Sequence, residues 1–180
     1  MLRFALAASL VFAAGCRIQL SDAPASQVGD DGVDGGSSGR ACTVSTSSPS
    51  CLAADMQQPA PTLGWVEANI FKTSCVFSGC HNGGSSKQGM VDLRVGMSYA
   101  HLVGYTSMID PSRKLVVAND VHASYLMLML HDYEPAMATP AGSSPPGDIG
   151  YMPQGTSGEP LCCQKLDALE RWITAGAPNN

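Results

Sequence analysis

The chain has 180 residues and a formal net charge of -5, from 10 basic and 15 acidic side chains. Its lysines and arginines form no cluster, which excludes nucleic acid and anionic lipid headgroups as partners, because both are recognised by concentrated positive charge. Seven cysteines are a high count for this length, and they indicate disulfides, covalent cofactor attachment or both.

The N-terminus has the pattern of a secretory signal peptide. Arg3 precedes an apolar run over 4–14, which is too short to cross a bilayer core that needs about 20 apolar residues. The run ends in Ala-Ala-Gly-Cys at 13–16, which resembles a bacterial lipobox. The resemblance implies a signal peptide over 1–15, a lipid on Cys16, and an exported protein of the cell envelope, periplasmic or outer-surface, held at the membrane only by that lipid. An ordinary signal peptide with an incidental Cys16 is the alternative.

The stretch 16–55 is predicted to be a lipid-anchored flexible linker. Residues 29–39 are rich in Gly, Asp and Ser and have almost nothing to bury, so their composition predicts a disordered tether. Such a tether lets a domain lie tens of ångströms from its anchor. Cys42 and Cys51 bracket a Ser/Thr-rich piece, which is compatible with a small stapled loop at the edge of the domain.

Three helices are expected after the linker. Residues 63–73 carry apolar side chains on one face and predict the first helix. A short amphipathic helix is expected over 98–105. The apolar run within 122–132 predicts the third helix, with Asp120 before it as a cap. A strand is the alternative there, because the run is short and residues 115–118 favour β structure.

The last helix is the clearest in the sequence. Its apolar stripe is formed by Leu166, Leu169, Trp172 and Ile173. Asp167 and Arg171 have the i,i+4 spacing of an ion pair, while Gly176 and Pro178 mark the end of the helix. Helices separated by Gly/Pro/Ser-rich stretches predict an all-α, loop-rich domain over 56–180 with a single core.

The segment Cys75-Val-Phe-Ser-Gly-Cys80-His81 carries the most specific chemistry of the chain. Covalent haem attachment needs two thiols that reach the two vinyl groups of one macrocycle, followed by an imidazole that falls under the iron. The usual spacing is Cys-x-x-Cys-His, and here it is two residues longer, as in some multihaem cytochromes c. A Cys75–Cys80 disulfide that closes a small loop, with His81 an ordinary polar residue, is the alternative.

Further residues extend this motif in a fixed order over 63–178. They are Ile70-Phe71, the Gly-Met-Val-Asp-Leu segment at 89–93, Ala-Ser-Tyr-Leu at 123–126, Met152-Pro153, Arg171-Trp172-Ile173 and Ala-Gly-Ala-Pro at 175–178. This order resembles class I cytochromes c and, more closely, the planctomycete-type cytochrome c domains and related domains of bacterial surface lipoproteins. In such domains the first and last helices cross, which would bring Phe71 near Leu169 or Trp172.

The resemblance implies a small cytochrome c-like helical domain that carries one covalent haem c. Cys75 and Cys80 would be the thioether residues, His81 the proximal ligand and Met152 the distal ligand. A thioether opposite an imidazole favours Fe(II) and raises the reduction potential relative to two imidazoles. The implied function is electron transfer with redox partner proteins of the envelope, without a bound substrate and without enzymatic activity.

Other residues compete for the ligand roles. His101, His122 and His131 are rival distal ligands, although a surface or capping role suits each of them better. Met127 and His131 have an i,i+4 spacing that could bind copper through a thioether and an imidazole, although core packing suits Met127 better.

The remaining cysteines define a second functional hypothesis. Cys162 and Cys163 are neighbours, and a direct bond between neighbours is strained, so each is expected to pair elsewhere, with Cys42 and Cys51 as candidates. A bridge from either of them to a motif cysteine would prevent covalent haem attachment. The alternative is therefore a haem-free, disulfide-stapled surface lipoprotein with a binding or structural role, marked by three bridges of which one uses a motif cysteine.

Overall fold

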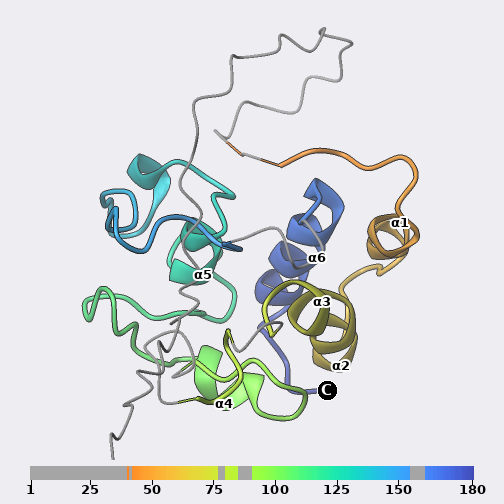
Figure 1. Cartoon of the computed structure of the whole chain (residues 1–180), viewed down its shortest axis with the longest axis horizontal. Helices are drawn as coiled ribbons and strands as arrows, with labels where there is room; N and C mark the ends of the chain where they lie inside the picture. Colours follow the sequence, from red (N-terminus) through yellow and green to blue (C-terminus); the bar gives the residue numbers. More distant parts are fainter. Residues whose placement is uncertain (1–39, 41, 77–79, 85–90, 155–160) are drawn as a thin grey trace, which may run out of the picture.

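A computed structural model describes residues 40, 42–76, 80–84, 91–154 and 161–180 of the chain (Figure 1). The predicted signal peptide, the lipidation at Cys16 and the Gly-rich part of the tether lie outside the described residues. These described residues contain eight helical segments: α1 (Pro49–Asp55), α2 (Leu63–Val66), η1 (Glu67–Phe71), α3 (Lys72–Ser74), α4 (Ser98–Leu102), α5 (Tyr125–Met129), η3 (Pro135–Met137) and α6 (Cys163–Thr174). Within these ranges no helix is long and apolar enough to cross a membrane.

The segments α2, η1 and α3 form one continuous helical rod over 63–74, which confirms the first predicted helix. The rod begins where the Thr62 side chain accepts a hydrogen bond from the Trp65 N–H at 3.1 Å, which satisfies one of the first unpaired amides of the helix. Its middle, η1, is a π-helical turn, a wider conformation that interrupts α-helices and is frequent at functional sites. The apolar face of the rod is buried through Leu63, Val66, Ile70 and Phe71.

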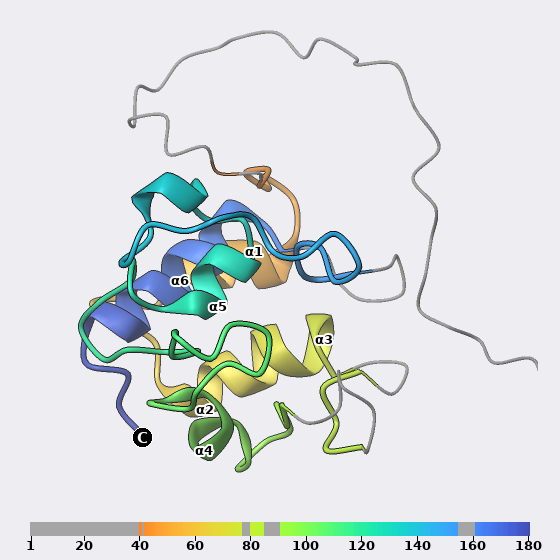
Figure 2. The same cartoon turned by 90° about the vertical axis from the view of Figure 1, so that its left-hand side faces the viewer.

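Helix α6 is the central element of the domain, and its predicted apolar stripe is confirmed. Leu166, Leu169, Trp172 and Ile173 are all at most 1% exposed. The helix ends where Gly176 takes a φ of +95° and the Ala177 N–H donates to the Trp172 carbonyl at 2.9 Å, a left-handed ending that suits glycine. Figure 1 shows α6 lying between α1 and α5, and Figure 2, seen from the side of α5, shows α5 in front of α6.

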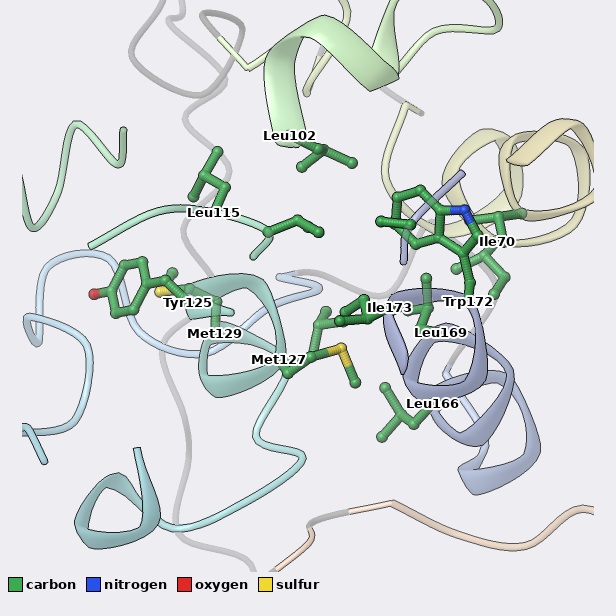
Figure 3. Close-up of a cluster of buried hydrophobic side chains, with 14 of the residues drawn as sticks. Ile70, Leu102, Leu115, Tyr125, Met127, Met129, Leu166, Leu169, Trp172 and Ile173 are labelled. Carbon is green, nitrogen blue, oxygen red and sulfur yellow. The ribbon is translucent and has the colours of Figure 1, made fainter. Parts of the chain in front are cut away.

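The core is one buried cluster that joins the rod, α5 and α6. Phe71, Leu169 and Trp172 all belong to it, so the first and last long helices pack together. Figure 3 shows Ile70 beside the indole of Trp172, and it shows Met127 of α5 facing Leu166. The cluster buries about twenty apolar side chains, which is the main source of stability in a domain of this size.

The expected Asp167–Arg171 ion pair is wrong, because longer-range partners use both side chains. The Arg171 guanidinium donates to the carbonyls of Ala54 at 2.8 Å and Gln57 at 3.2 Å, so it closes the C-terminal end of α1. Asp167 instead forms an ion pair with Arg40. Cations stabilise the last carbonyls of a helix, and here the cation comes from a helix remote in sequence.

The short helices α4 and α5 end earlier than their sequence patterns predict. Helix α4 stops at Leu102 because Val103 turns extended and forms an isolated parallel bridge with Val116. Ahead of α5, the Ala123 N–H donates to the Asp120 carboxylate at 2.9 Å, so this residue does cap the turn that leads into the helix. The strand alternative for 122–132 is wrong, and the described residues contain isolated bridges but no sheet.

The segment 42–55 belongs to the folded domain, although its composition places it in the predicted linker. Disulfides join Cys42 to Cys163 and Cys51 to Cys162, so the neighbouring cysteines of α6 do pair elsewhere, with the two expected candidates. Gln164 adds two hydrogen bonds to the backbone of Ser45. Covalent bonds and amide hydrogen bonds order this polar segment, which has little apolar surface to order it. The domain boundary therefore precedes residue 42.

Candidate functional site

An open apolar cavity lies between the ends of α3, α4 and α5. Its empty space is about 910 Å³ when the open solvent at its mouth is included. Figure 3 shows three of its lining residues, Leu102, Leu115 and Met129, on different elements. The other lining residues are Ser74, Cys75, Cys80, His81, Val91, Leu93, Ile109, Leu126, Leu130, Met152, Pro153 and Gln154.

The predicted site residues Cys75, Cys80, His81 and Met152 all line this cavity. They come from three segments: the end of the rod, the loop after it, and the loop before α6. Of the described lining residues none carries a carboxylate, an ammonium or a guanidinium group. The polar atoms of the wall are therefore mainly thiols, thioethers, one imidazole, one hydroxyl and one amide.

The two motif cysteines are not disulfide-bonded, so the Cys75–Cys80 bridge of the alternative interpretation is not formed. Cys75 follows the last turn of α3, and its N–H donates to the Phe71 carbonyl at 2.8 Å. Burial raises the pKa of the Cys75 thiol to about 12; Lys165 opposes this rise and Cys80 adds to it. The thiol of Cys75 is therefore protonated at neutral pH.

His81 reaches the cavity from a loop that pairs with residues 91–93. The Leu93 N–H donates to the His81 carbonyl at 2.8 Å. Behind this contact, Arg94 donates to the buried Asp92 carboxylate with its Nη2 at 2.6 Å, and these hydrogen bonds hold the pKa of Asp92 below its usual range. Gly83 has a φ of +76°, and a Cβ there would lie 2.6 Å from Asp92 Oδ2, so the loop requires glycine at this position.

Met152 reaches the cavity from the loop that precedes α6. Its N–H donates to the Met129 carbonyl at 2.7 Å, which fixes the loop against the C-terminal end of α5. Met129 also lines the cavity, so two thioethers share the wall. The role of Met129 was not predicted from the sequence. Its signal is the i,i+3,i+4 spacing of Leu126, Met129 and Leu130, which places one face of α5 on the cavity.

The rival distal ligands do not line the cavity. His101 stacks on Tyr105, with ring centroids 5.6 Å apart, and His122 lies against Tyr133 at 4.9 Å. His131 stacks on Tyr151 at 3.9 Å. Each of these imidazoles therefore packs on a tyrosine instead of facing the two motif thiols.

The copper hypothesis for Met127 and His131 is not supported by their positions. Met127 is fully buried in the core, in agreement with its expected packing role (Figure 3). Helix α5 ends at Met129, and His131 has a φ of +56°, so the two side chains do not share a helix face. Among the described residues there is no group of three or more His, Cys, Asp or Glu side chains arranged to hold a metal ion.

Chemically, this wall suits an apolar ligand that carries a metal ion. The thiols can bond covalently to the ligand, and the imidazole or a thioether can donate a lone pair to its metal ion.

Comparisons of the chain with protein-family models, with curated proteins and with solved structures gave no match.

Proposed function

We propose that the domain is a single-haem c-type electron carrier of the cell envelope, with a cytochrome c-like arrangement of its helices. The observation that carries this proposal is that Cys75, Cys80, His81 and Met152 line one apolar cavity. Met152 is far in sequence from Cys75, Cys80 and His81, so the meeting of all four residues in one cavity is not a consequence of the motif alone.

The residues present fit such a group in three respects. The two motif thiols stay out of disulfides in a chain whose four other described cysteines are bridged. An imidazole follows the second thiol directly, and two thioethers share the same wall. The rest of the lining is almost entirely apolar, as a porphyrin face requires.

In this proposal the lining residues have different roles. Cys75 and Cys80 would hold the macrocycle covalently, and His81 and Met152 would offer a nitrogen and a sulfur to its iron. When bound, haem would supply a one-electron centre whose potential would depend on these two side chains and on the apolar surroundings. Leu102, Leu115 and the other apolar lining residues exclude water from the site, and redox partner proteins of the envelope exchange the electron.

Anchoring through Cys16 is the second part of the proposal. A signal peptide over 1–15 and a lipid on Cys16 would leave the domain on a tether outside the cytoplasm, where the Cys42–Cys163 and Cys51–Cys162 bridges persist. Metabolic labelling with a radioactive fatty acid tests this directly. The label is expected on the natural chain and is expected to be absent from Cys16→Ser.

The function is tested by the visible spectrum of the protein produced with c-type maturation machinery. Covalent haem that survives acid–organic extraction is expected for the natural chain and is expected to be lost in Cys75→Ser combined with Cys80→Ser. His81→Ala should abolish haem retention. His122→Ala, which removes an exposed histidine outside the cavity, is the matched control and should leave the spectrum unchanged.

The distal ligand is tested by two methionine variants. Met152→Ala should leave haem attached but lower the reduction potential and open the iron to added ligands. Met129→Ala should leave both properties near those of the natural protein. The opposite result would assign the distal role to Met129, and unchanged spectra in His81→Ala and Met152→Ala together would overturn the haem proposal.

A haem-free, disulfide-stapled lipoprotein is the second candidate function, and the two observed bridges favour it only weakly. They staple 42–51 to α6, which such a protein needs. However, its expected bridge through a motif cysteine is not formed. Protein that carries no haem after maturation, and that binds an apolar dye in the cavity, would favour this candidate.

A further inference from the structure

The loop that carries Met152 meets the end of α5 at two consecutive residues. At the first, the Tyr151 ring lies on the His131 ring, with centroids 3.9 Å apart and planes inclined by only 5°. At the second, the Met152 N–H donates to the Met129 carbonyl at 2.7 Å. One contact is between side chains and the other between backbones, so together they restrain both the position and the rotation of the loop.

His131 is held in place by the chain reversal at the end of α5. It takes a φ of +56°, a conformation that non-glycine residues adopt uncommonly. Its N–H donates to the Leu128 carbonyl at 3.0 Å, and the next N–H, of Asp132, donates to the Met127 carbonyl at 3.0 Å. These hydrogen bonds fix the backbone from which the imidazole projects. The ring is therefore a fixed surface, and the loop is the part that is positioned on it.

Tyr151 has few other restraints. Its hydroxyl donates to Ser144 Oγ at 3.3 Å, within an exposed stretch of the same loop. The preceding Gly150 has a φ of +67°, and its N–H bonds back to the Pro146 carbonyl at 2.8 Å, so this part of the loop is closed on itself. The ring stack on His131 is thus the contact that connects the Tyr151 side chain to the helical body beside the cavity, while Ile149 and Met152 of the same loop pack against the core.

We propose that the stacked rings of His131 and Tyr151 form a clamp that positions Met152 in the cavity wall. His131 is then a positioning residue that acts through Tyr151, and it is not itself a ligand. The effect of the clamp on Met152 as a haem ligand rests on the proposed function, whereas the restraint of the Met152 loop does not need a cofactor. The restraint of the loop and its effect on the ligand can therefore be tested separately.

Three variants isolate the clamp. Tyr151→Leu removes the ring but keeps apolar bulk, and Tyr151→Phe keeps the ring but removes the hydroxyl. His131→Asn removes the imidazole with a residue that tolerates a left-handed backbone, so it tests the same contact from the helix side if Tyr151→Leu folds poorly. The matched control is His122→Asn, which disrupts a different histidine–tyrosine contact, that of His122 with Tyr133.

The first measurement uses the haem-free full chain and follows hydrogen exchange at the Met152 amide. An aromatic pair of this kind contributes enough that its loss should speed local opening about three- to tenfold. This increase is expected in Tyr151→Leu and His131→Asn, and not in Tyr151→Phe or His122→Asn. Equal exchange rates in all four folded variants would overturn the clamp, whether or not the protein binds haem.

The second measurement uses the haem-loaded protein and follows the rate at which imidazole added to the solution displaces the distal ligand. Tyr151→Leu and His131→Asn should raise this rate about three- to tenfold at unchanged haem content, and Tyr151→Phe should restore it. An unchanged displacement rate would overturn the link between the clamp and the ligand. Absence of haem from the natural chain would instead overturn the proposed function, while the exchange experiment would still decide the clamp.

Discussion

The two sides of α6 use the same residue type in opposite ways. On the side of α1, four cysteines form two bridges that bind the segment 42–51 to the beginning of the helix. On the side of the cavity, Cys75 and Cys80 are not bridged, and the wall is held by the hydrogen bonds and ring contact described above. We call these the stapled side and the cavity side.

This difference separates stability from site construction. The stapled side has a polar segment with little apolar surface, and covalent bonds compensate for the core that it lacks. The cavity side leaves apolar surface uncovered and keeps its thiols, which costs stability that a ligand could return on binding. The predictions below test whether the two sides differ in this way, in order of the expected loss of unfolding free energy.

Removal of both bridges should have the largest effect. Cys42–Cys163 and Cys51–Cys162 span 121 and 111 residues, and a loop of about 100 residues is worth ~4.7 kcal/mol in the chain-entropy model. The second bridge closes only a short loop once the first exists, so the pair should contribute about 7 kcal/mol. Urea unfolding of the chain with these four cysteines changed to alanine measures the loss.

The matched control for that experiment changes the cavity cysteines instead. Cys75→Ala with Cys80→Ala removes two partly buried thiols and no bridge, so it should shift the unfolding free energy by only about 1 kcal/mol. A similar loss from both sets of substitutions would show that the two sides do not differ as described.

Glu67 offers a test of the hydrogen bonds on the cavity side. This buried carboxylate, at 4% exposure, accepts from the Gly96 N–H at 2.9 Å and from Ser98 Oγ at 2.7 Å, and so ties the rod to α4. Glu67→Leu leaves both donors without an acceptor and should cost about 3 kcal/mol in thermal or urea unfolding. Glu67→Gln keeps an acceptor and should recover most of that loss; equal costs would contradict this role.

Arg171 offers the corresponding test on the stapled side. Arg171→Met keeps an unbranched side chain that resembles the arginine stem and removes the hydrogen bonds to the carbonyls of Ala54 and Gln57. The expected cost is about 2 kcal/mol while both bridges are intact, because the bridges still hold α1 near α6. A cost near zero would mean that water replaces the guanidinium without penalty at the end of α1.

The smallest effect at neutral pH should come from the Cys75 thiol, whose pKa is raised to about 12 by burial. In the unfolded chain this thiol ionises near its ordinary pKa, about 8.5. Between these two values the folded state binds more protons than the unfolded state, so stability should fall as pH rises above about 8.5 and should be unaffected below it. Cys75→Ala should remove this part of the pH dependence.

Alkylation of Cys75 in the haem-free protein measures the same pKa directly. Only the thiolate reacts, so the rate with iodoacetamide should rise tenfold per pH unit without levelling off near pH 9. A plateau between pH 8 and pH 9 would show that burial does not protect this thiol. Mass spectrometry of digested samples resolves Cys75 from the other cysteines.

The helices with strong apolar stripes could be predicted from the sequence. The rod over 63–74 and α6 place Ile70, Phe71, Leu169 and Trp172 in one core, and their local spacing already indicates their buried faces. The ends of α4 and α5 could not be predicted in this way. They depend on the Val103–Val116 bridge and on the left-handed turn at His131, and both arise from contacts outside the helix itself.

The candidate site was predictable where chemistry is concentrated in a short motif. Cys75, Cys80 and His81 stand out by residue type, and Met152 by its place before α6; all four line the cavity. Local spacing groups Met129 with Leu126 and Leu130 and apart from Met127, but it does not say which face of α5 meets a cavity and which meets the core. The folded state of 42–55 depends on partners more than 100 residues away, which a reading of local composition does not include.

The long span of the two bridges also sets the order in which a growing chain can be oxidised. Among the cysteines that follow Cys16, Cys42 and Cys51 emerge first, Cys75 and Cys80 next, and the native partners Cys162 and Cys163 last. For most of synthesis, the nearest thiols to the first pair are therefore the wrong ones. Correct maturation then requires that the first pair stay reduced, that early bridges be reshuffled, or that the middle pair be captured before the last pair arrives.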